Sequence, residues 1–200
     1  MTVSAQKTLS TTEELSEALE IFKSMGFSRI QLPGGTSKDK SFCSSAIITV
    51  WNDEKKMFYF VCMPYNPLFH MAGDENGHTK KLGETPQQTV LREIQEETGL
   101  FVEESDLVYL SKSKIVVPDR YDKEKIHHKH YFLVKNFSGT LFDFDGPSRI
   151  DAETAAPVLI AAHLLKDCLF PGHKSAVREA AEVLGAEKKE AQWLFADLGF

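Results

Sequence analysis

The stretch GETPQQTVLREIQEETGL, from Gly83 to Leu100, carries the strongest local signals in this chain. Thr85 is a good helix N-cap, and Pro86 suits the first helical position because its missing N–H costs nothing there. Gln88, three residues after the cap, completes a capping-box pattern. Gly99 supplies the left-handed residue that ends many helices. These signals predict a short, well-capped helix between Thr85 and Gly99.

The two sides of this helix carry different residues. Its apolar side can pack on a core through Val90, Leu91, Ile94 and Leu100. The opposite side carries Arg92, Glu93, Glu96 and Glu97, at positions i, i+1, i+4 and i+5. Clustered carboxylates repel one another unless a cation compensates, and Mg²⁺ and Mn²⁺ prefer oxygen ligands. An acidic surface face is the simpler alternative, but the caps and the upstream Glu84 favour a divalent metal site.

The segment resembles the Nudix box, whose pattern is Gly-x5-Glu-x7-Arg-Glu-U-x-Glu-Glu-x-Gly-U, with U aliphatic. The matching residues are Glu84, Arg92, Glu93, Ile94, Glu96, Glu97, Gly99 and Leu100. The chain departs from the pattern at its first position, where His78 stands in place of glycine and Gly77 lies one residue earlier. In the family, the loop before the helix offers a backbone carbonyl to a metal, and glycine permits the backbone shape that this requires. So many matched positions make the motif a strong one.

The resemblance implies a fold, an activity and a cofactor. The fold is α/β: a Nudix-type α/β/α sandwich around a mixed β-sheet, here with an added N-terminal helix and a helical C-terminal region. The activity is metal-dependent hydrolysis of the pyrophosphate bond in a nucleoside diphosphate linked to another group, with ADP-ribose or another sugar nucleotide favoured as substrate. The cofactor is Mg²⁺ or Mn²⁺, which neutralises phosphate oxygens and activates water in such reactions.

The resemblance also implies roles for the residues of the motif. The expected metal ligands and catalytic residues are Glu93, Glu96 and Glu97. Arg92 is expected to orient a glutamate rather than to touch the substrate. Glu84 is expected to support the loop or to bind a further metal, and the backbone carbonyl of His78 is a conditional metal ligand.

Residues outside the motif complete the candidate site. Glu153 is the predicted general base, because it lies near the point where a late acidic residue often comes in this family. The competing carboxylates are Asp119, Asp122, Glu124 and Asp151. Lys80 and Arg120 are candidate contacts to the substrate phosphates, with simple solvent exposure as the alternative.

Three histidines, His127, His128 and His130, invite a zinc interpretation. Alternation along a strand places His128 and His130 on the same face. No cysteine or carboxylate is spaced to complete a tetrahedral site with them. His128 is therefore retained as a candidate contact to the substrate phosphate or leaving group, with a plain position at the start of a strand as the alternative.

Two other functions are compatible with the same motif. One is a sensor or regulatory domain that binds a nucleotide without cleaving it, which the departure at His78 supports. The other is an isomerase acting on a prenyl diphosphate, which needs a reactive cysteine; Cys43 and Cys62 are the candidates. The intact acidic residues of the motif favour the hydrolase over both.

Composition sets the broad class of the protein. Two hundred residues suit one domain with a sizeable core. The formal net charge of −6 argues against generic nucleic-acid binding, although a bound metal can still attract a nucleotide. The three cysteines are too scattered for a disulfide framework. The absence of a signal peptide and of a membrane span predicts a cytoplasmic protein with a small-molecule substrate. Members of the resembled family are often homodimers, for which the first helix offers a contact surface.

Local patterns predict the remaining elements of what is expected to be a single domain of residues 1–200. Residues 11–25 read as an amphipathic helix in an N-terminal extension, residues 1–40, that precedes a core of residues 41–200. Residues 46–51 and 57–63 read as a β-hairpin, residues 107–117 and 131–137 as strands, and residues 141–144 as a short strand. Residues 64–77 read as a loop whose Tyr65 and Phe69 either flank a base or sugar or pack internally. Residues 118–129 read as a charged connection, and helices are predicted at residues 157–168, 174–184 and 187–198.

Overall fold

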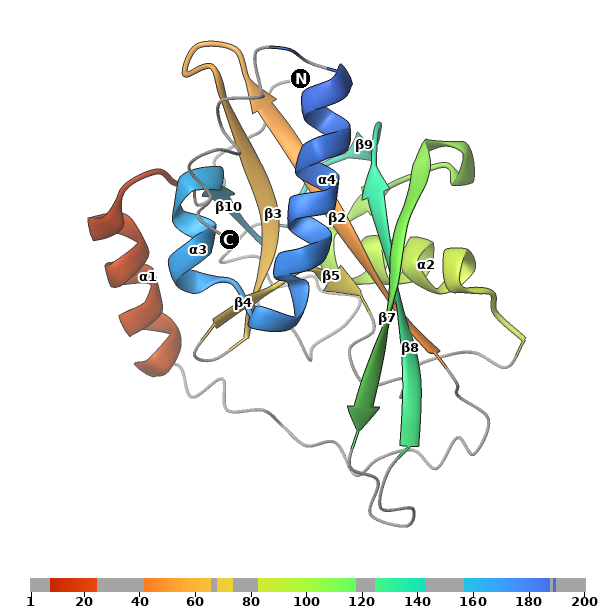
Figure 1. The fold of residues 1–200 in the computed structure, drawn as a ribbon. Coiled ribbons are helices and arrows are strands. Elements are labelled where there is room, and N and C mark those ends of the chain that lie inside the picture. The colour runs from red at the N-terminus through yellow and green to blue at the C-terminus, as the bar shows by residue number, and fades with distance from the viewer. Residues whose placement is uncertain are drawn as a thin grey trace.

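The chain is built around one large mixed β-sheet (Figure 1). The computed structural model describes residues 8–24, 42–65, 68–73, 83–117, 125–142, 157–187 and 189. Within these residues, eight strands form the sheet in the order β1-β10-β3-β2-β8-β7, with β4 paired to β3 and β5 paired to β2. Their bounds are β1 Thr8–Leu9, β2 Phe42–Asn52, β3 Met57–Tyr65, β4 Leu68–His70, β5 Ala72–Gly73, β7 Leu107–Val117, β8 Lys125–Val134 and β10 Val158–Ala161. A separate small pair joins β6 Leu100–Phe101 to β9 Ser138–Gly139.

Parallel and antiparallel pairs both occur in the main sheet. The predicted hairpin is confirmed: β2 and β3 pair antiparallel, from Thr49 opposite Phe60 to Asn52 opposite Met57. Lys56, in the turn between them, has a positive φ of 50°. On its other edge β2 pairs in parallel with β8, and β8 pairs antiparallel with β7. The central strand β2 thus links the two halves of the sheet.

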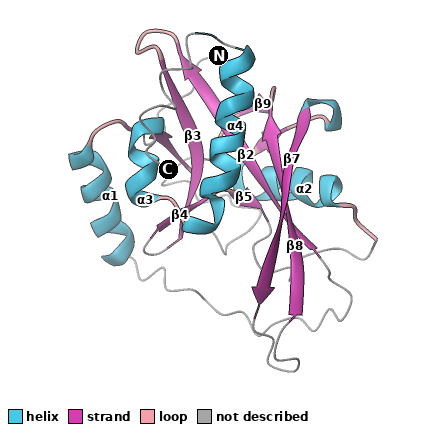
Figure 2. Ribbon diagram, viewed as in Figure 1, coloured by secondary structure: helices cyan, strands magenta, loops and turns pink. Residues whose placement is uncertain are grey.

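Helices cover both faces of this sheet. The helices are α1 Thr12–Ser24, α2 Pro86–Thr98, α3 Leu165–Cys168 and α4 Lys174–Glu187. In the view of Figure 1, α4 crosses in front of the sheet and α2 lies behind it, while α1 stands at the edge beside α3. Figure 2 shows the same arrangement as helices on either side of the strands. The predicted α/β/α sandwich around a mixed sheet is therefore confirmed.

Local sequence signals set the limits of α2. Thr85 accepts a hydrogen bond from the Gln88 backbone N–H and the Gln88 side chain bonds back to the cap, so the predicted capping box is present. Gly99 ends the helix in the left-handed conformation, with φ 79°. The buried side of α2 includes Val90 and Ile94, which join the core. The opposite side is left to carry the charged residues of the motif.

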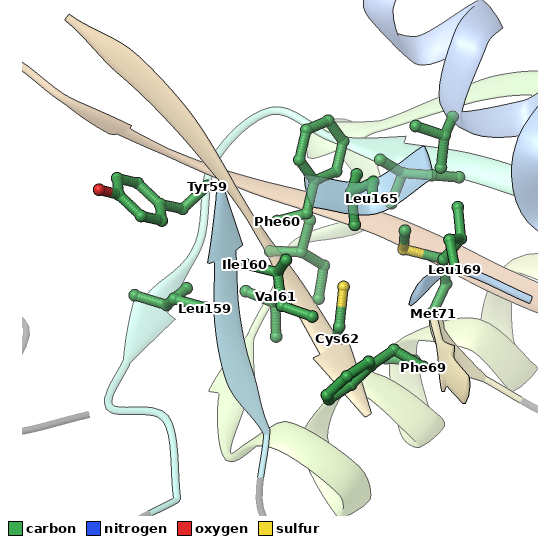
Figure 3. Packing of buried hydrophobic residues seen from close by; sticks show 14 of the residues in the cluster. Tyr59, Phe60, Val61, Cys62, Phe69, Met71, Leu159, Ile160, Leu165 and Leu169 are labelled. Atoms are coloured by element: carbon green, nitrogen blue, oxygen red, sulfur yellow. The ribbon is translucent and has the colours of Figure 1, made fainter. Parts of the chain in front are cut away.

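Side chains from many strands form one continuous core. Figure 3 shows part of it, where Phe60 and Cys62 of β3 meet Ile160 of β10 and Leu165 of α3. Phe69 of β4 is fully buried in the same cluster. Of the two alternatives for Phe69, internal packing is the correct one. The side chain of Tyr65 lies outside what the structure describes.

Several predicted elements are corrected by the structure. Residues 157–168 do not form one helix: they begin with strand β10, continue through a 3₁₀ turn at Ala162–Leu164 and end in α3. All four residues of β10 are buried, since this strand lies between β1 and β3 and must be apolar on both faces. A short apolar run of this kind cannot be distinguished from a buried helix by periodicity alone.

The remaining corrections concern shorter segments. Residues 64–77 are not simply a loop, because they contain the buried strands β4 and β5. Strand β8 begins at Lys125, six residues before the predicted start, so part of the expected connection is a strand that pairs with β7. The predicted strand at 141–144 is not a strand in its described part, and β9 lies earlier instead. The helix predicted at 174–184 is confirmed as α4; the one at 187–198 lies outside the described residues except at its first residue and at residue 189.

Candidate active site

One arginine joins three carboxylates: Glu93 and Glu96 on α2, and Glu84 just before this helix. Arg92 Nε donates to Glu84 Oε1 over 3.1 Å and a terminal nitrogen of Arg92 reaches Glu84 Oε2 at 3.3 Å, which is a two-pronged contact. The other terminal nitrogen donates to Glu93 Oε1 at 2.8 Å and to Glu96 Oε2 at 2.7 Å. Thr89 Oγ1 donates to Glu84 Oε2 at 3.2 Å. The planar, multi-donor guanidinium suits such a junction in a way that lysine does not.

Burial makes this junction electrostatically significant. Glu93 is only 4% exposed, so its charge is removed from most of its water. Burial by itself lowers the pKa of Arg92, but the hydrogen bond to Glu84, the charge of Glu93 and the hydrogen bond to Glu96 outweigh burial and raise it. Arg92 is therefore permanently charged. It compensates part of the negative charge that α2 carries and fixes the orientation of three carboxylates.

Glu97 is held by a different partner. Its Oε2 accepts a hydrogen bond of 2.7 Å from the backbone N–H of Gly73, the last residue of β5. Gly73 lies opposite Ser45 in the pairing of β5 with β2 and has a φ of +142°. A Cβ at this position would stand 2.2 Å from the backbone oxygen of Ser44. Only glycine allows β5 to approach β2 closely enough to present its N–H to Glu97.

The predicted site residues fall into three groups. Glu84, Arg92, Glu93 and Glu96 meet in one cluster of ion pairs. Glu97 lies on the same helix but contacts β5, and His128 lies on β8. His78, Lys80, Arg120 and Glu153 lie outside the described residues, as do the competing Asp119, Asp122, Glu124 and Asp151.

No metal-binding arrangement is complete within the part of the chain that the structure describes. Among those residues, no three side chains of His, Cys, Asp or Glu converge closely enough to hold an ion. The guanidinium of Arg92 contacts three of the carboxylates, and the fourth, Glu97, turns to Gly73. The donors are nevertheless carboxylate oxygens, the kind that Mg²⁺ and Mn²⁺ prefer.

His128 and His130 lie on β8, beside residues of β2 and β7. His128 pairs in register with Phe42 of β2, and the next residue on the same face of β8, His130, pairs with Ser44. Ring contacts join His130 to Phe42 at 5.8 Å and to Tyr109 of β7 at 5.9 Å between centroids. Burial, followed by the charges of Lys112 and His128, lowers the pKa of His130. His130 is therefore neutral near pH 7.

Sequence reasoning missed several residues of this region. Gly73 had no motif to mark it, and its role depends on a strand that the local pattern did not reveal. Phe42, Ser44 and Tyr109 become neighbours of the histidines only through strand pairing. The sole local hint was the alternation that places His128 and His130 on one face.

The two cysteines proposed for isomerase chemistry are both buried. Burial, with a smaller effect of Cys168, raises the pKa of the Cys62 thiol well above its usual range. A thiol with a raised pKa is a poor proton donor or nucleophile near neutral pH. Neither Cys43 nor Cys62 has the setting of a reactive residue.

A comparison with protein families defines the class of this protein. The family model described as the NUDIX domain matches residues 45–179, which is more than half of the chain. The chain belongs to the Nudix family. Its class is that of the Nudix-type pyrophosphohydrolases. No curated protein matches the sequence.

Two solved structures with TM-scores of 0.54 and 0.50 agree on the fold. The NUDIX domain of Shewanella oneidensis NrtR, in complex with ADP ribose, is similar with a TM-score of 0.54 and 15% identity, over 82% of this chain and 98% of that one. The Escherichia coli ORF135 protein is similar with a TM-score of 0.50 and 18% identity, over 76% and 97%. A MutT/nudix family protein from Enterococcus faecalis has a TM-score of 0.46 and 13% identity over 77% of this chain, which spans only 57% of that longer protein.

None of the described helices combines the length and the apolar character needed to cross a membrane.

Proposed function

We propose that this protein hydrolyses the pyrophosphate bond of a nucleoside diphosphate linked to another group, with Mg²⁺ or Mn²⁺ as cofactor. The observation that carries the proposal is the orientation of the motif carboxylates. Arg92 joins Glu84, Glu93 and Glu96, and the Gly73 N–H holds Glu97. Groups fixed before the substrate arrives lose little freedom on binding, which is what catalysis of phosphoryl transfer requires.

The cation is part of the proposal. Glu93, Glu96 and Glu97 would supply hard oxygen ligands, with Glu84 and the His78 carbonyl as further candidates. A divalent ion bound there would neutralise charge on the phosphate oxygens and activate the attacking water. Arg92 acts through the glutamates as a positioning residue, because its guanidinium contacts carboxylates on α2 and Glu84 before it.

Other residues of the proposal come from the sequence. Glu153 is our candidate for the general base, and Lys80 and Arg120 are candidate contacts to the phosphates. His128, on β8, is a candidate substrate contact. A homodimer in solution, expected from the resemblance to the family, also stays a prediction.

ADP-ribose is the first compound to test. The NUDIX domain of S. oneidensis NrtR was crystallised with it, and that domain has the same fold over most of this chain. Sugar nucleotides share the nucleoside diphosphate group, so they form the second set. A compound with a pyrophosphate bond but no nucleoside completes the panel.

The test is metal-dependent product release from this panel, with Glu97→Gln beside the wild type. Loss of a carboxylate charge at a metal ligand should reduce kcat/KM by about two orders of magnitude or more. Mutation of a residue that only hydrogen-bonds to a metal ligand already lowers metal affinity or activity by about 10- to 100-fold. Glu104→Gln, an exposed glutamate in the turn before β7, is the matched control and should retain full activity.

Two results would contradict the proposal. Equal activity of Glu97→Gln and the wild type would show that the α2 carboxylates do not take part in the reaction. Nucleotide binding with no cleavage of any compound would favour a nucleotide sensor instead.

A further inference from the structure

One face of the sheet carries a row of rings that the motif does not explain. In the register of β2 with β8, Phe42 lies opposite His128 and Ser44 opposite His130. Tyr131, the neighbour of His130, points the other way, because its hydroxyl donates to the Gly172 backbone oxygen just before α4. The row therefore lies on the face opposite α4. That is the side of the sheet on which α2 lies in Figure 1.

An irregularity in β7 brings a third strand into the row. The pairing of β7 with β8 shifts between Tyr109, opposite Phe132, and Lys112, opposite His130. Because Phe132 and His130 share a face, the shift places both Tyr109 and Lys112 on that face as well. The Tyr109 ring lies 5.9 Å from His130 and 5.5 Å from Phe132. Tyr109 is nevertheless 50% exposed, so it contributes far less to the core than a ring of its size can.

Polar atoms of the same row lack hydrogen-bond partners. Ser44 is fully buried, and among the residues that the structure describes its Oγ has no hydrogen-bond partner. The Nδ1 atom of His128 is also inaccessible and without a hydrogen-bond partner. A buried polar atom of this kind costs stability, and its presence needs an explanation such as a ligand. His130 is neutral near pH 7, so its ring both donates and accepts hydrogen bonds.

This row is adjacent to the carboxylates of α2. The backbone oxygen of Ser44 is the atom closest to the missing Cβ of Gly73. The N–H of the same glycine holds Glu97. A continuous path of contacts therefore runs from Glu97 through Gly73 to Ser44 and, by strand pairing, to His130. The row is thus linked to Glu97 through strands β5 and β2.

We propose that Phe42, His130 and Tyr109 form the site for the nucleobase of the substrate, with Ser44 and His128 hydrogen-bonding to the edge of the heterocycle. The proposal rests on the function proposed above and adds the position and chemistry of base recognition. Rings favour an aromatic heterocycle over a sugar, since bases stack on aromatic side chains. The hydroxyl of Ser44 and the neutral imidazole of His130 suit the mixed hydrogen-bond donors and acceptors of a base edge.

The test separates the base from the rest of the nucleotide. Binding of AMP, GMP, CMP and UMP is measured by calorimetry beside ribose 5-phosphate, which has the sugar and phosphate but no base. Wild type should bind at least one mononucleotide more tightly than ribose 5-phosphate. Tyr109→Ala should weaken the binding of that mononucleotide about tenfold, the order of one lost stacking contact. The affinity for ribose 5-phosphate should not change. In turnover, KM should rise with little change in kcat.

Two further variants make the result specific. Phe101→Ala removes another large exposed ring, 54% exposed on β6, and should change neither affinity. Ser44→Ala removes a hydroxyl that has no partner, so the fold should tolerate it while the preferred base is bound more weakly.

Each outcome decides the inference. An unchanged ratio of mononucleotide to ribose 5-phosphate affinity in both Tyr109→Ala and Ser44→Ala would overturn it, even if hydrolysis of nucleoside diphosphates is intact. A base-dependent affinity that falls in Tyr109→Ala would support it even if no hydrolysis is detected, in which case only the proposed reaction fails. The two failures are thus distinguishable.

Discussion

Arg92 is the residue on which the arrangement of the α2 carboxylates depends. Its guanidinium is mostly buried and contacts Glu84, Glu93 and Glu96. Arg92→Ala would leave three negative groups close together without their cation, and removing one partner of a buried ion pair costs about 3–5 kcal/mol. We expect a loss of about 2–4 kcal/mol in unfolding free energy, measured by urea denaturation, because the cluster keeps some contact with water.

The same variant should also change the response to metal. Without Arg92 the three glutamates repel one another, so a divalent cation should raise the melting temperature of Arg92→Ala more than that of the wild type. Arg178→Ala is the control: Arg178 forms only an exposed pair with Glu182 on α4, and such pairs contribute about 0.5 kcal/mol or less. Equal losses of unfolding free energy in Arg92→Ala and Arg178→Ala would show that the cluster around Arg92 stabilises the fold no more than an exposed ion pair does.

Gly73 is required by space as well as by backbone shape. In Gly73→Ala the new methyl group would meet the Ser44 backbone oxygen, so β5 would have to move away from β2. Overpacking and backbone strain together should cost about 3 kcal/mol, and Glu97 should lose its N–H partner. Gly83→Ala is the comparison, since Gly83 also has positive φ but nothing lies near its missing Cβ. Gly83→Ala should cost about 1 kcal/mol. Calorimetric unfolding of both variants then distinguishes the cost of steric overpacking from the cost of the positive φ.

His130 links stability to pH. Burial, then Lys112 and His128, lowers its pKa in the folded protein below the value near 6.5 that an unfolded chain has. Between these two values the unfolded state binds more protons, so stability rises with pH through this interval and is complete above about pH 6.5. Acidification from pH 7.5 to 5 should therefore destabilise the wild type more than His130→Gln. Denaturant midpoints at several pH values measure this, and parallel pH profiles would contradict it.

At the scale of elements, α2 is the helix that its local sequence specifies most completely. The Thr85 side chain accepts a hydrogen bond of 3.2 Å from the Gln88 backbone N–H, and the Gln88 side-chain oxygen accepts one from the Thr85 backbone N–H. Thr85→Ala should cost about 1 kcal/mol, the usual value of an N-cap. Thr85→Asp, which keeps an accepting oxygen and adds a charge favourable at this end of a helix, should restore most of the loss. Similar melting temperatures of Thr85→Ala and the wild type would show that packing alone defines the start of α2.

The elements that could be predicted are those whose signals lie within themselves. Helix α2 has its caps, and the β2–β3 hairpin has its alternation and polar turn, so both could be placed from the sequence. Strand β10 could not, because its four buried residues acquire strand character only between β1 and β3. Strands β4 and β5 are too short to carry a periodic pattern, and pairing with β3 and β2 defines them.

The candidate site divides in the same way. The residues of the motif could be named because they lie on one helix with fixed spacing, and the structure brings Arg92 to Glu84, Glu93 and Glu96 as that spacing suggests. The contact of Glu97 with Gly73 crosses to a strand 24 residues away in sequence. The row of Phe42, His130 and Tyr109 crosses three strands, so no local sequence pattern predicts it.

At the scale of the whole molecule, the N-terminal residues belong to the sheet as well as to the expected added helix. Strand β1 pairs in parallel with β10 and forms one edge of the main sheet. Leu9, Leu15 and Ala18 are buried members of the core cluster. In addition, Ser10 Oγ and the Tyr59 hydroxyl of β3 lie within hydrogen-bond distance, at 3.1 Å. The first helix and strand are thus packed on the same core as the rest of the described chain.

Removal of residues 1–24 tests whether this packing is essential. The truncated protein would expose the edge of β10 and the apolar surface that Leu9 and Leu15 cover. Each fully buried leucine contributes about 1.5–3 kcal/mol, so the truncation should lower the unfolding free energy by about 3 kcal/mol or more and should promote association through the open strand edge. Leu15→Ala should produce part of this loss, and the exposed Glu17→Ala on the same helix almost none. Chemical denaturation and light scattering measure the two effects; a truncated chain as stable and monodisperse as its parent would show that the N-terminal residues are a dispensable addition to the fold.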